Sequence, residues 1–338
     1  MTNSKVETRR DQSFDVLKGI LILIVVLGHA LQYQYQEDCW HQPLFDGIYT
    51  FHMPLFVFVS GFFFYSCTRR SFHDMIVNKS KRLMLPWLIW SIVLVVAMCI
   101  IQKETFFSLS TREKGTILFQ EFQTFWYLIC VFVLTLFYYP IFKKDLYKKK
   151  LIHIAVVAFL FLAWLLSLIF FDDLPWFCLK YCQITRQTLV FGLGVLYCLY
   201  GRKLTGGGIF LILTLAVAGI VYDRLSWGRW IFDYTLEQRI IDGIWCTIIA
   251  FMVLKNISNV VSKQSWLCKP LAYLGKNSLG IYLVHIAFFH PMLKNQLLPS
   301  YHTVSSSIIL FACYLVISII IIEIIKRLLK DKSYLLGI

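Results

Sequence analysis

The sequence predicts an all-α, polytopic transmembrane helical bundle. Hydrophobic residues make up 58% of the 338 residues and charged residues only 15%, whereas a soluble domain of this length needs more polar surface. Apolar runs of about 20 residues, the length that crosses a bilayer as a helix, recur along the chain. The net charge of +14 fits the excess of Lys and Arg in cytoplasmic loops of membrane proteins. Membrane lipid is therefore an expected partner, and nucleic acid is not.

Ten spans with both termini cytoplasmic are expected, within a single domain covering 1–338. The loops alternate in charge: segments expected on the cytoplasmic side, with the span ends next to them, hold 22 of the 33 Lys and Arg residues, and those on the other side, counted in the same way, hold 9. Because basic loops stay cytoplasmic, this alternation requires an even number of spans. The spans are expected near 14–35, 47–66, 84–102, 122–142, 151–171, 185–200, 208–222, 237–254, 271–293 and 305–329.

The first expected span is apolar but contains Asp15, Lys18 and His29. Lys18 and His29 are eleven residues apart, which at about 100° per residue is about 20° past three full turns, so the three side chains share one stripe. Charged and titratable groups inside a membrane helix are costly, which favours a functional site. The alternative for Lys18 is an ordinary lysine reaching to the membrane boundary. Asp15 is expected to pair with Lys18, because about 21 Å of rise separates it from His29.

Two more histidines fall at the depth of His29, in the outer half of the membrane. His52 lies in the second span and His285 in the ninth. An imidazole, with an ordinary pKa of about 6.5, can take a proton from a hydroxyl at neutral pH; the alternative is a single interhelical hydrogen bond. Tyr282, one turn before His285, and Trp126, at the start of the fourth span, belong to the same layer. They are either a stacking wall for a sugar or part of the interfacial aromatic belt.

The third span is expected to start at Pro86, after the basic residues Lys79 and Arg82. With Lys18 at a similar depth, these cations can receive a phosphate-rich donor or can simply flank the span on the cytoplasmic side. The fifth to eighth spans and the tenth follow from apolar runs and from the alternation of charge in the loops between them. The sequence has no Gly-rich phosphate loop, zinc motif or nucleophile elbow, and its ten cysteines show no metal-ligand spacing.

Five short segments, at both ends and in the middle of the chain, form a specific combination. They are FDVLKGILILIVVLGH (14–29), FHMPLFVFVSGFFF (51–64), KRLMLPW (81–87), FWYL (125–128) and GKNSLGIYLVH (275–285). Together they resemble the acyltransferase 3 family of integral-membrane acyltransferases, and within it the fucose 4-O-acetylase-like members. The family pattern of a basic residue, ten others and a histidine corresponds to Lys18 and His29. Many members have Arg at the first position, and Arg-x-x-Arg where this chain has Lys79 and Arg82.

The resemblance implies an O-acyltransferase, usually an O-acetyltransferase, in the bacterial inner membrane. Its donor substrate would be acetyl-CoA or another acyl-CoA, its acceptor a hydroxyl of a cell-envelope sugar or lipid-linked glycan, and it would hold no bound cofactor or metal. His29 would act as general base. The expected site residues are His29, Lys18 and Asp15 for catalysis, His52, Trp126, Tyr282 and His285 for substrate binding, and Lys18, Lys79 and Arg82 for the donor.

Two questions stay open at the level of sequence. A transporter or flippase of an envelope glycan intermediate also suits intramembrane ionisable groups, and Asp242 and Glu323 would then be candidates for proton coupling. For the enzyme, the donor cations lie well below His29. Either the pantetheine arm of the donor reaches up to the histidine, or a covalent acyl-enzyme carries the group.

Overall fold

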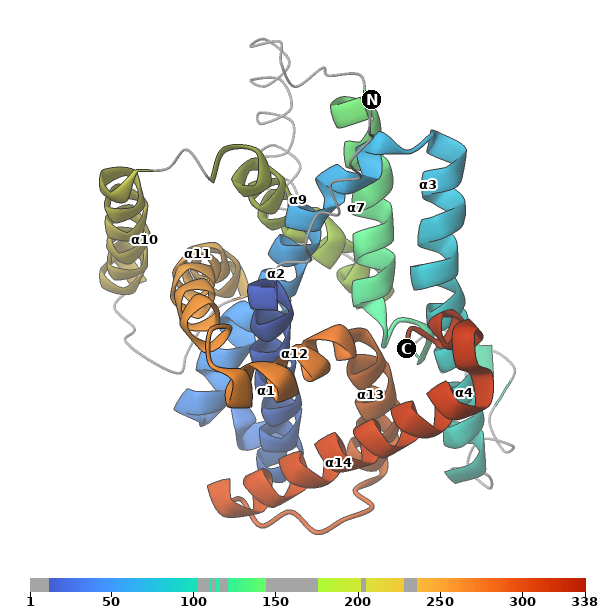
Figure 1. Ribbon diagram of the computed structural model, residues 1–338. Coiled ribbons are helices and arrows are strands. Elements are labelled where there is room, and N and C mark those ends of the chain that lie inside the picture. Colours follow the sequence, from blue (N-terminus) through green and yellow to red (C-terminus); the bar gives the residue numbers. More distant parts are fainter. Residues whose placement is uncertain are drawn as a thin grey trace.

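The computed structural model describes residues 12–101, 110, 114–115, 121–143, 176–201, 205–227 and 236–338, and within them the chain forms helices joined by turns, with no strand (Figure 1). This confirms the all-α bundle. The α-helices are α1 (Gln12–Tyr35), α2 (Pro43–Phe64), α3 (Phe72–Lys79), α4 (Leu85–Ile101), α7 (Trp126–Lys143), α9 (Trp176–Tyr200), α10 (Gly206–Trp227), α11 (Leu236–Val261), α12 (Ser265–Lys276), α13 (Ser278–Asn295) and α14 (Val304–Leu329). The shorter elements are η1 (Gln36–His41), η2 (Tyr65–Arg69), η3 (Ser80–Met84) and η6 (Lys330–Leu336).

Within this described part, six helical segments are long and apolar enough to cross a membrane. Three shorter apolar helices, Gln187–Tyr200, Gly206–Tyr222 and Ser278–Leu293, match further expected spans. The span expected at 151–171 lies outside the described residues, so the number of spans and the side of the termini stay predictions. The six long segments are Gln12–His41, Pro43–Arg69, Phe72–Ile101, Trp126–Lys143, Gly243–Val261 and Val304–Leu336.

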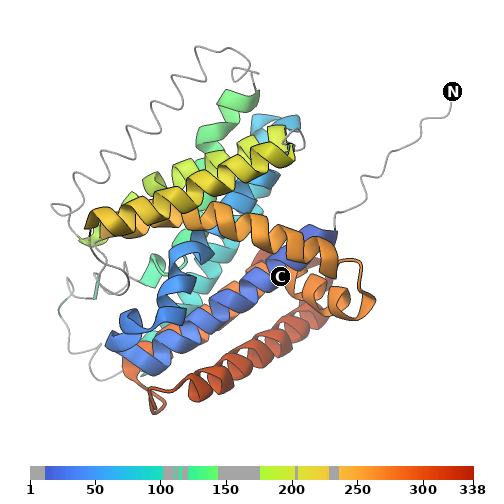
Figure 2. The same ribbon diagram turned by 90° about the vertical axis from the view of Figure 1, so that its left-hand side faces the viewer.

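Helix α14 shows how the bundle meets lipid. It runs alongside α1 (Figure 2), and its outer face exposes large apolar side chains that include Ile309, Ile320 and Leu328. Such a face is unfavourable in water and suits hydrocarbon, while the helix satisfies its own backbone groups. The chain is therefore an integral membrane protein.

Two helix boundaries differ from the sequence prediction. The third apolar helix does not start at Pro86: helical backbone begins at Phe72, and Pro86 follows a π-helical turn, Ser80–Met84. Proline lacks the N–H for an ordinary helical bond, and a π turn is a usual place where a helix absorbs such a defect. Ser71 caps the earlier start, because its Oγ accepts a hydrogen bond from the backbone N–H of Asp74.

The expected span 271–293 is also two helices, which meet at Asn277. The Nδ2 of Asn277 donates a hydrogen bond to the carbonyl of Tyr273 at 2.9 Å, and its backbone N–H donates to the same oxygen at 3.1 Å. A side chain that bonds the backbone in this way competes with the helix and ends it. Helix α13 therefore takes a direction of its own, which carries Tyr282 and His285.

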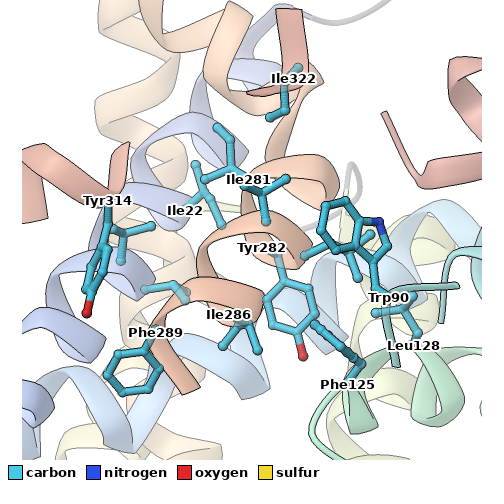
Figure 3. Packing of buried hydrophobic residues seen from close by; sticks show 14 of the residues in the cluster. Ile22, Trp90, Phe125, Leu128, Ile281, Tyr282, Ile286, Phe289, Tyr314 and Ile322 are labelled. Carbon is cyan, nitrogen blue, oxygen red and sulfur yellow. The ribbon is translucent and has the colours of Figure 1, made fainter. Parts of the chain in front are cut away.

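Glycines let α1 and α12 approach closely. A Cβ at Gly19 would overlap the backbone carbonyl of Leu271, and a Cβ at Gly275 would overlap that of Asp15. Small residues at such crossings bring membrane helices into direct backbone contact. Helix α13 packs against α1, α4 and α14 in turn, and its Ile281, Tyr282 and Ile286 form much of the core in Figure 3. This packing fixes the position of α13 relative to α1.

Candidate active site

A cavity of about 580 Å³ lies in the half of the bundle that contains His29. Its walls come from α1, α2, α9, α11, α13 and the start of α7. Four of the predicted site residues line this cavity, here called the acceptor cavity. They are His29, His52, Trp126 and Tyr282.

His285 lies behind His29 rather than on the cavity wall. The Nε2 of His285 is 2.8 Å from the Nδ1 of His29, and the two ring centroids are 5.1 Å apart, as an edge-to-edge hydrogen bond between the rings requires. Phe289 stacks on His29 at 4.7 Å, and the side chain of His285 is fully buried. The imidazole of His29 is therefore held by neighbours from α13.

The partners of His285 fix which ring nitrogens carry protons. Its Nδ1 is 2.6 Å from the backbone carbonyl of Ile281; a carbonyl only accepts, so this Nδ1 carries the proton and donates. The Nε2 of the neutral His285 then accepts from the Nδ1–H of His29. The remaining nitrogen of His29, Nε2, keeps a free lone pair. This is the protonation state that a general base needs.

His52 is assigned by the same argument. Its Nδ1 lies 2.8 Å from the carbonyl of Ile48, to which it donates. The Nε2 of His52 is then an acceptor in the neutral ring and a donor when protonated. Because His52 is buried and lines the acceptor cavity, it can contact a bound hydroxyl or a developing oxyanion.

A second cavity, of about 250 Å³, lies toward the end of the bundle where α1 begins. Lys18 and Lys79 both line it, and the Nζ of Lys18 is 4.5 Å from the ring centroid of Phe63. Ser60 and Tyr127, whose hydroxyls are 2.8 Å apart, form part of its wall. This space, here called the donor cavity, combines two cations with an apolar lining.

The two cavities share a wall. Met53 and Tyr282 line both of them. The ring of Tyr282 makes edge contacts with Tyr127 at 5.8 Å and with Phe125 at 6.2 Å, the latter visible in Figure 3. A flexible methionine and one tyrosine thus separate the space beside His29 from the space beside Lys18 and Lys79.

Besides His285, two predicted site residues line neither cavity. The side chain of Asp15 is buried where α1 crosses α12, and it lines neither cavity. Arg82, in the π-helical turn, is exposed and also lies outside the donor-cavity wall. Their catalytic and donor-binding roles stay predictions, and the geometry gives them no direct support.

The structure adds polar residues to the acceptor cavity that the sequence argument did not single out. His290 lines the cavity, with its Nε2 2.9 Å from Oε2 of the buried Glu121. Two further wall residues pair with each other: the hydroxyl of Tyr49 donates to Oε1 of Gln32 at 2.7 Å. His290 could have been found from the sequence, because it follows His285 by little more than one helical turn. Glu121 could not, because it precedes α7 and belongs to no periodic helical pattern. Among the described residues, no three His, Cys, Asp or Glu side chains gather as a metal site requires.

Comparison with known families supports the same class of enzyme. The model of the acyltransferase domain family matches residues 11–327, which includes every residue of both cavities. The chain belongs to the acyltransferase 3 family. The protein is thus an integral membrane acyltransferase.

Two curated relatives of this acyltransferase carry the same name. The nodulation protein NolL of Mesorhizobium japonicum is 27% identical over 308 residues, which cover 84% of this chain and 78% of the relative. The nodulation protein NolL of Sinorhizobium fredii is 37% identical over 128 residues, 36% of this chain and 34% of that protein. No solved structure matches the acyltransferase.

Proposed function

We propose that the protein transfers an acetyl group from acetyl-CoA to a hydroxyl of a cell-envelope sugar or lipid-linked glycan at the bacterial inner membrane. The observation that carries this proposal is the hydrogen-bonded row from the carbonyl of Ile281 through His285 to His29. It presents an unprotonated Nε2 at the wall of a cavity large enough for a small molecule, since such sites span about 300–1,000 Å³.

The chemical step follows from this arrangement. The Nε2 of His29 takes the proton of the acceptor hydroxyl while the hydroxyl oxygen bonds to the thioester carbonyl carbon. The carbon–sulfur bond then breaks, and the CoA thiolate takes the proton back from the imidazolium. The products are an acetyl ester and free CoA. Because the Nδ1 of His29 is held by His285, the ring stays aimed during both proton transfers.

The other polar walls of the acceptor cavity have supporting roles. The Nε2 of His52 and the hydroxyl of Tyr282 are candidates to orient the acceptor or to stabilise the oxyanion of the tetrahedral intermediate. Trp126 offers an aromatic face on which the apolar side of a sugar ring can pack.

The donor cavity gives acyl-CoA a route to His29. Lys18 and Lys79 are placed to hold its phosphates through charge-assisted hydrogen bonds. The charge pattern of the loops predicts that this end of the bundle faces the cytoplasm, where CoA thioesters are made. The thioester would pass Met53 and Tyr282 to meet the acceptor. The shared wall favours direct transfer over a covalent acyl-enzyme, because only the side chains of Met53 and Tyr282 separate the two substrates.

Nothing in the described residues favours the transporter alternative. Glu323 accepts hydrogen bonds from the hydroxyl of Tyr273 at 2.6 Å and from Nζ of Lys326 at 3.0 Å, and it lines neither cavity. The side chain of Asp242, the other proton-coupling candidate, lies outside the described residues.

The test is transfer of labelled acetyl from acetyl-CoA to envelope glycan in membranes that carry matched amounts of protein. The wild type should label the glycan, and His29→Ala should abolish the labelling. His73→Ala is the matched control, because His73 is an exposed histidine on α3 that lines neither cavity. Equal labelling by wild type and His29→Ala would discard His29 as the base, and export of glycan with no acyl product would favour the transporter.

A further inference from the structure

A third cavity, of about 450 Å³, adjoins the acceptor cavity at the end of the bundle where α1 runs into η1. The two cavities share Gln32 and Leu293 as wall residues. The rest of the wall comes from the end of α1, from η1 and from the segment after α13. This space is called the vestibule here. The loops that form it are expected on the outer side of the membrane.

The vestibule is a built structure. The backbone N–H of Tyr301 donates to Oε1 of Gln34 at 2.9 Å, and Nε2 of Gln36 donates to the Oγ of Ser300 at 3.1 Å. The hydroxyl of Tyr33 donates to the carbonyl of Leu298 at 2.8 Å. These bonds fasten the segment after α13 to the end of α1, so the two halves of the wall are held in register.

Three wall residues of the vestibule have backbone in the left-handed region. The φ angles are 49° at Gln36, 46° at Gln296 and 51° at His302, and within the described chain only one other non-glycine residue, Lys330, has a positive φ. Such conformations cost free energy and persist where the surroundings impose them, often at ligand sites. Their concentration around one cavity points to a wall shaped for a ligand.

The side chains of the vestibule fit a neutral sugar. Gln32, Gln36 and Gln296 offer amides that can donate to and accept from neighbouring hydroxyls. Glu37 and Asp38 are exposed acceptors that also repel anionic ligands. The adjacent Trp40 provides an aromatic surface for the C–H face of a sugar ring. The carboxylates argue against a phosphate or an acidic sugar at this position.

We propose that the vestibule binds the sugar next to the acetylated one, so that the acceptor is a neutral oligosaccharide. This inference rests on the proposed function, which places the reacting sugar in the acceptor cavity. Gln32, on the wall of both cavities, would contact both sugars. The vestibule then determines which glycans are substrates, while His29 and its neighbours carry out the transfer.

The test compares two acceptors that differ only in the sugars for the vestibule. Methyl α-L-fucoside supplies a single sugar, and 2′-fucosyllactose supplies the same sugar with two neutral neighbours; fucose is chosen for the resemblance noted in the sequence. Acetyl transfer from labelled acetyl-CoA is measured with the full-length protein in lipid nanodiscs. We expect kcat/KM for the trisaccharide to exceed that for the monosaccharide at least tenfold.

Two different changes of the vestibule should reduce this ratio to near one. Trp40→Ala removes the aromatic surface, and the pair Glu37→Gln and Asp38→Asn removes the charges at constant volume. The second variant is needed because Trp40 contacts Phe45 and Tyr49, so its loss can disturb folding. Trp266→Ala, at an exposed tryptophan in the first turn of α12, is the control and should keep the wild-type ratio.

A ratio near one in the wild type, or an unchanged ratio in both vestibule variants, overturns the inference. Saturation-transfer NMR of 2′-fucosyllactose separates this result from a failure of the proposed function. If the wild type acetylates neither probe, the proposed function fails for this sugar. Saturation of the lactose protons by the wild type, lost in both variants, would still support the vestibule, and absence of saturation would overturn it.

Discussion

The Nδ1 of His29 lies 2.8 Å from the Nε2 of His285, although 256 residues separate them in the chain. The contact depends on α13 packing against α1, and it buries His285 completely. The sequence argument gave His285 a substrate-binding role. Its position behind His29 fits a positioning role better, because it contacts the proposed base but lines neither cavity itself.

His285→Ala should lower kcat about 100-fold, the lower end of what a positioned base contributes, with little change in the KM for acetyl-CoA. His285→Gln should restore part of the rate, because its side-chain oxygen can accept from the Nδ1–H of His29. Steady-state kinetics on matched protein amounts checks both. Equal loss in the two variants, or a change in KM alone, would contradict the positioning role.

The lining of the donor cavity predicts which of the three basic residues affect the KM for acetyl-CoA most: Lys18 and Lys79 line it, and Arg82 does not. Lys18→Met and Lys79→Met should each raise the KM for acetyl-CoA about tenfold or more, because a hydrogen bond to a charged group contributes about 1.5–3 kcal/mol. Arg82→Met should change this KM less than about threefold, since screened surface charges contribute little and Arg82 lies off the cavity wall. Donor titration at saturating acceptor measures the three variants. A larger effect at Arg82 than at Lys79 would contradict the assignment of this cavity.

Met53 lies between the two cavities, so a larger side chain there should block contact between the two substrates. Met53→Trp should abolish acetyl transfer while acetyl-CoA still binds, because the larger side chain closes the shared wall. Met53→Leu conserves volume and should keep most of the activity. Binding of acetyl-CoA by calorimetry, beside the transfer assay, distinguishes a block from misfolding. Normal transfer by Met53→Trp would show that the substrates meet by another path.

The crossing of α1 and α12 predicts a stability effect. Gly275→Ala should destabilise the protein by about 1–3 kcal/mol, the usual cost of overpacking, because its Cβ would overlap the backbone carbonyl of Asp15. Gly207→Ala is the control, since an added Cβ there meets nothing within 4 Å. Thermal unfolding in detergent should show a midpoint several degrees lower for Gly275→Ala alone. Equal midpoints would mean that the helices can separate at little cost.

The sequence predicted the helical bundle and most helix positions because apolar length is a strong, local signal. It missed the junction at Asn277 and the early start at Phe72, since apolar content alone does not register a side-chain cap or a π turn. Both are decided by single side-chain hydrogen bonds, that of Asn277 to the carbonyl of Tyr273 and that of Ser71 to the backbone N–H of Asp74.

Depth along the helices brought His29, His52, Trp126 and Tyr282 to one cavity, as expected from helical geometry. The depth of a residue in the membrane does not reveal whether its side of the helix faces a cavity. Arg82 and Lys79 are three residues apart, yet only Lys79 lines the donor cavity. Arg82 lies in the π turn, where each residue rotates less about the helix axis than in an α-helix. Glu121 and His290 meet through tertiary packing, which a single sequence does not reveal.

The hydrogen-bonded row behind His29 ends at the amide oxygen of Ile281, which cannot take up a proton at neutral pH. A proton that reaches the cavity-facing nitrogen of His29 therefore has no exit through this row, and in the proposed step it returns to the reactants as the thiolate leaves. In each turnover the proton taken from the acceptor hydroxyl is the one given to the CoA thiolate, so no net proton is taken up or released by the protein. The proposed reaction would then run equally well in energised and de-energised membranes, drawing on the thioester bond and leaving the proton-motive force untouched.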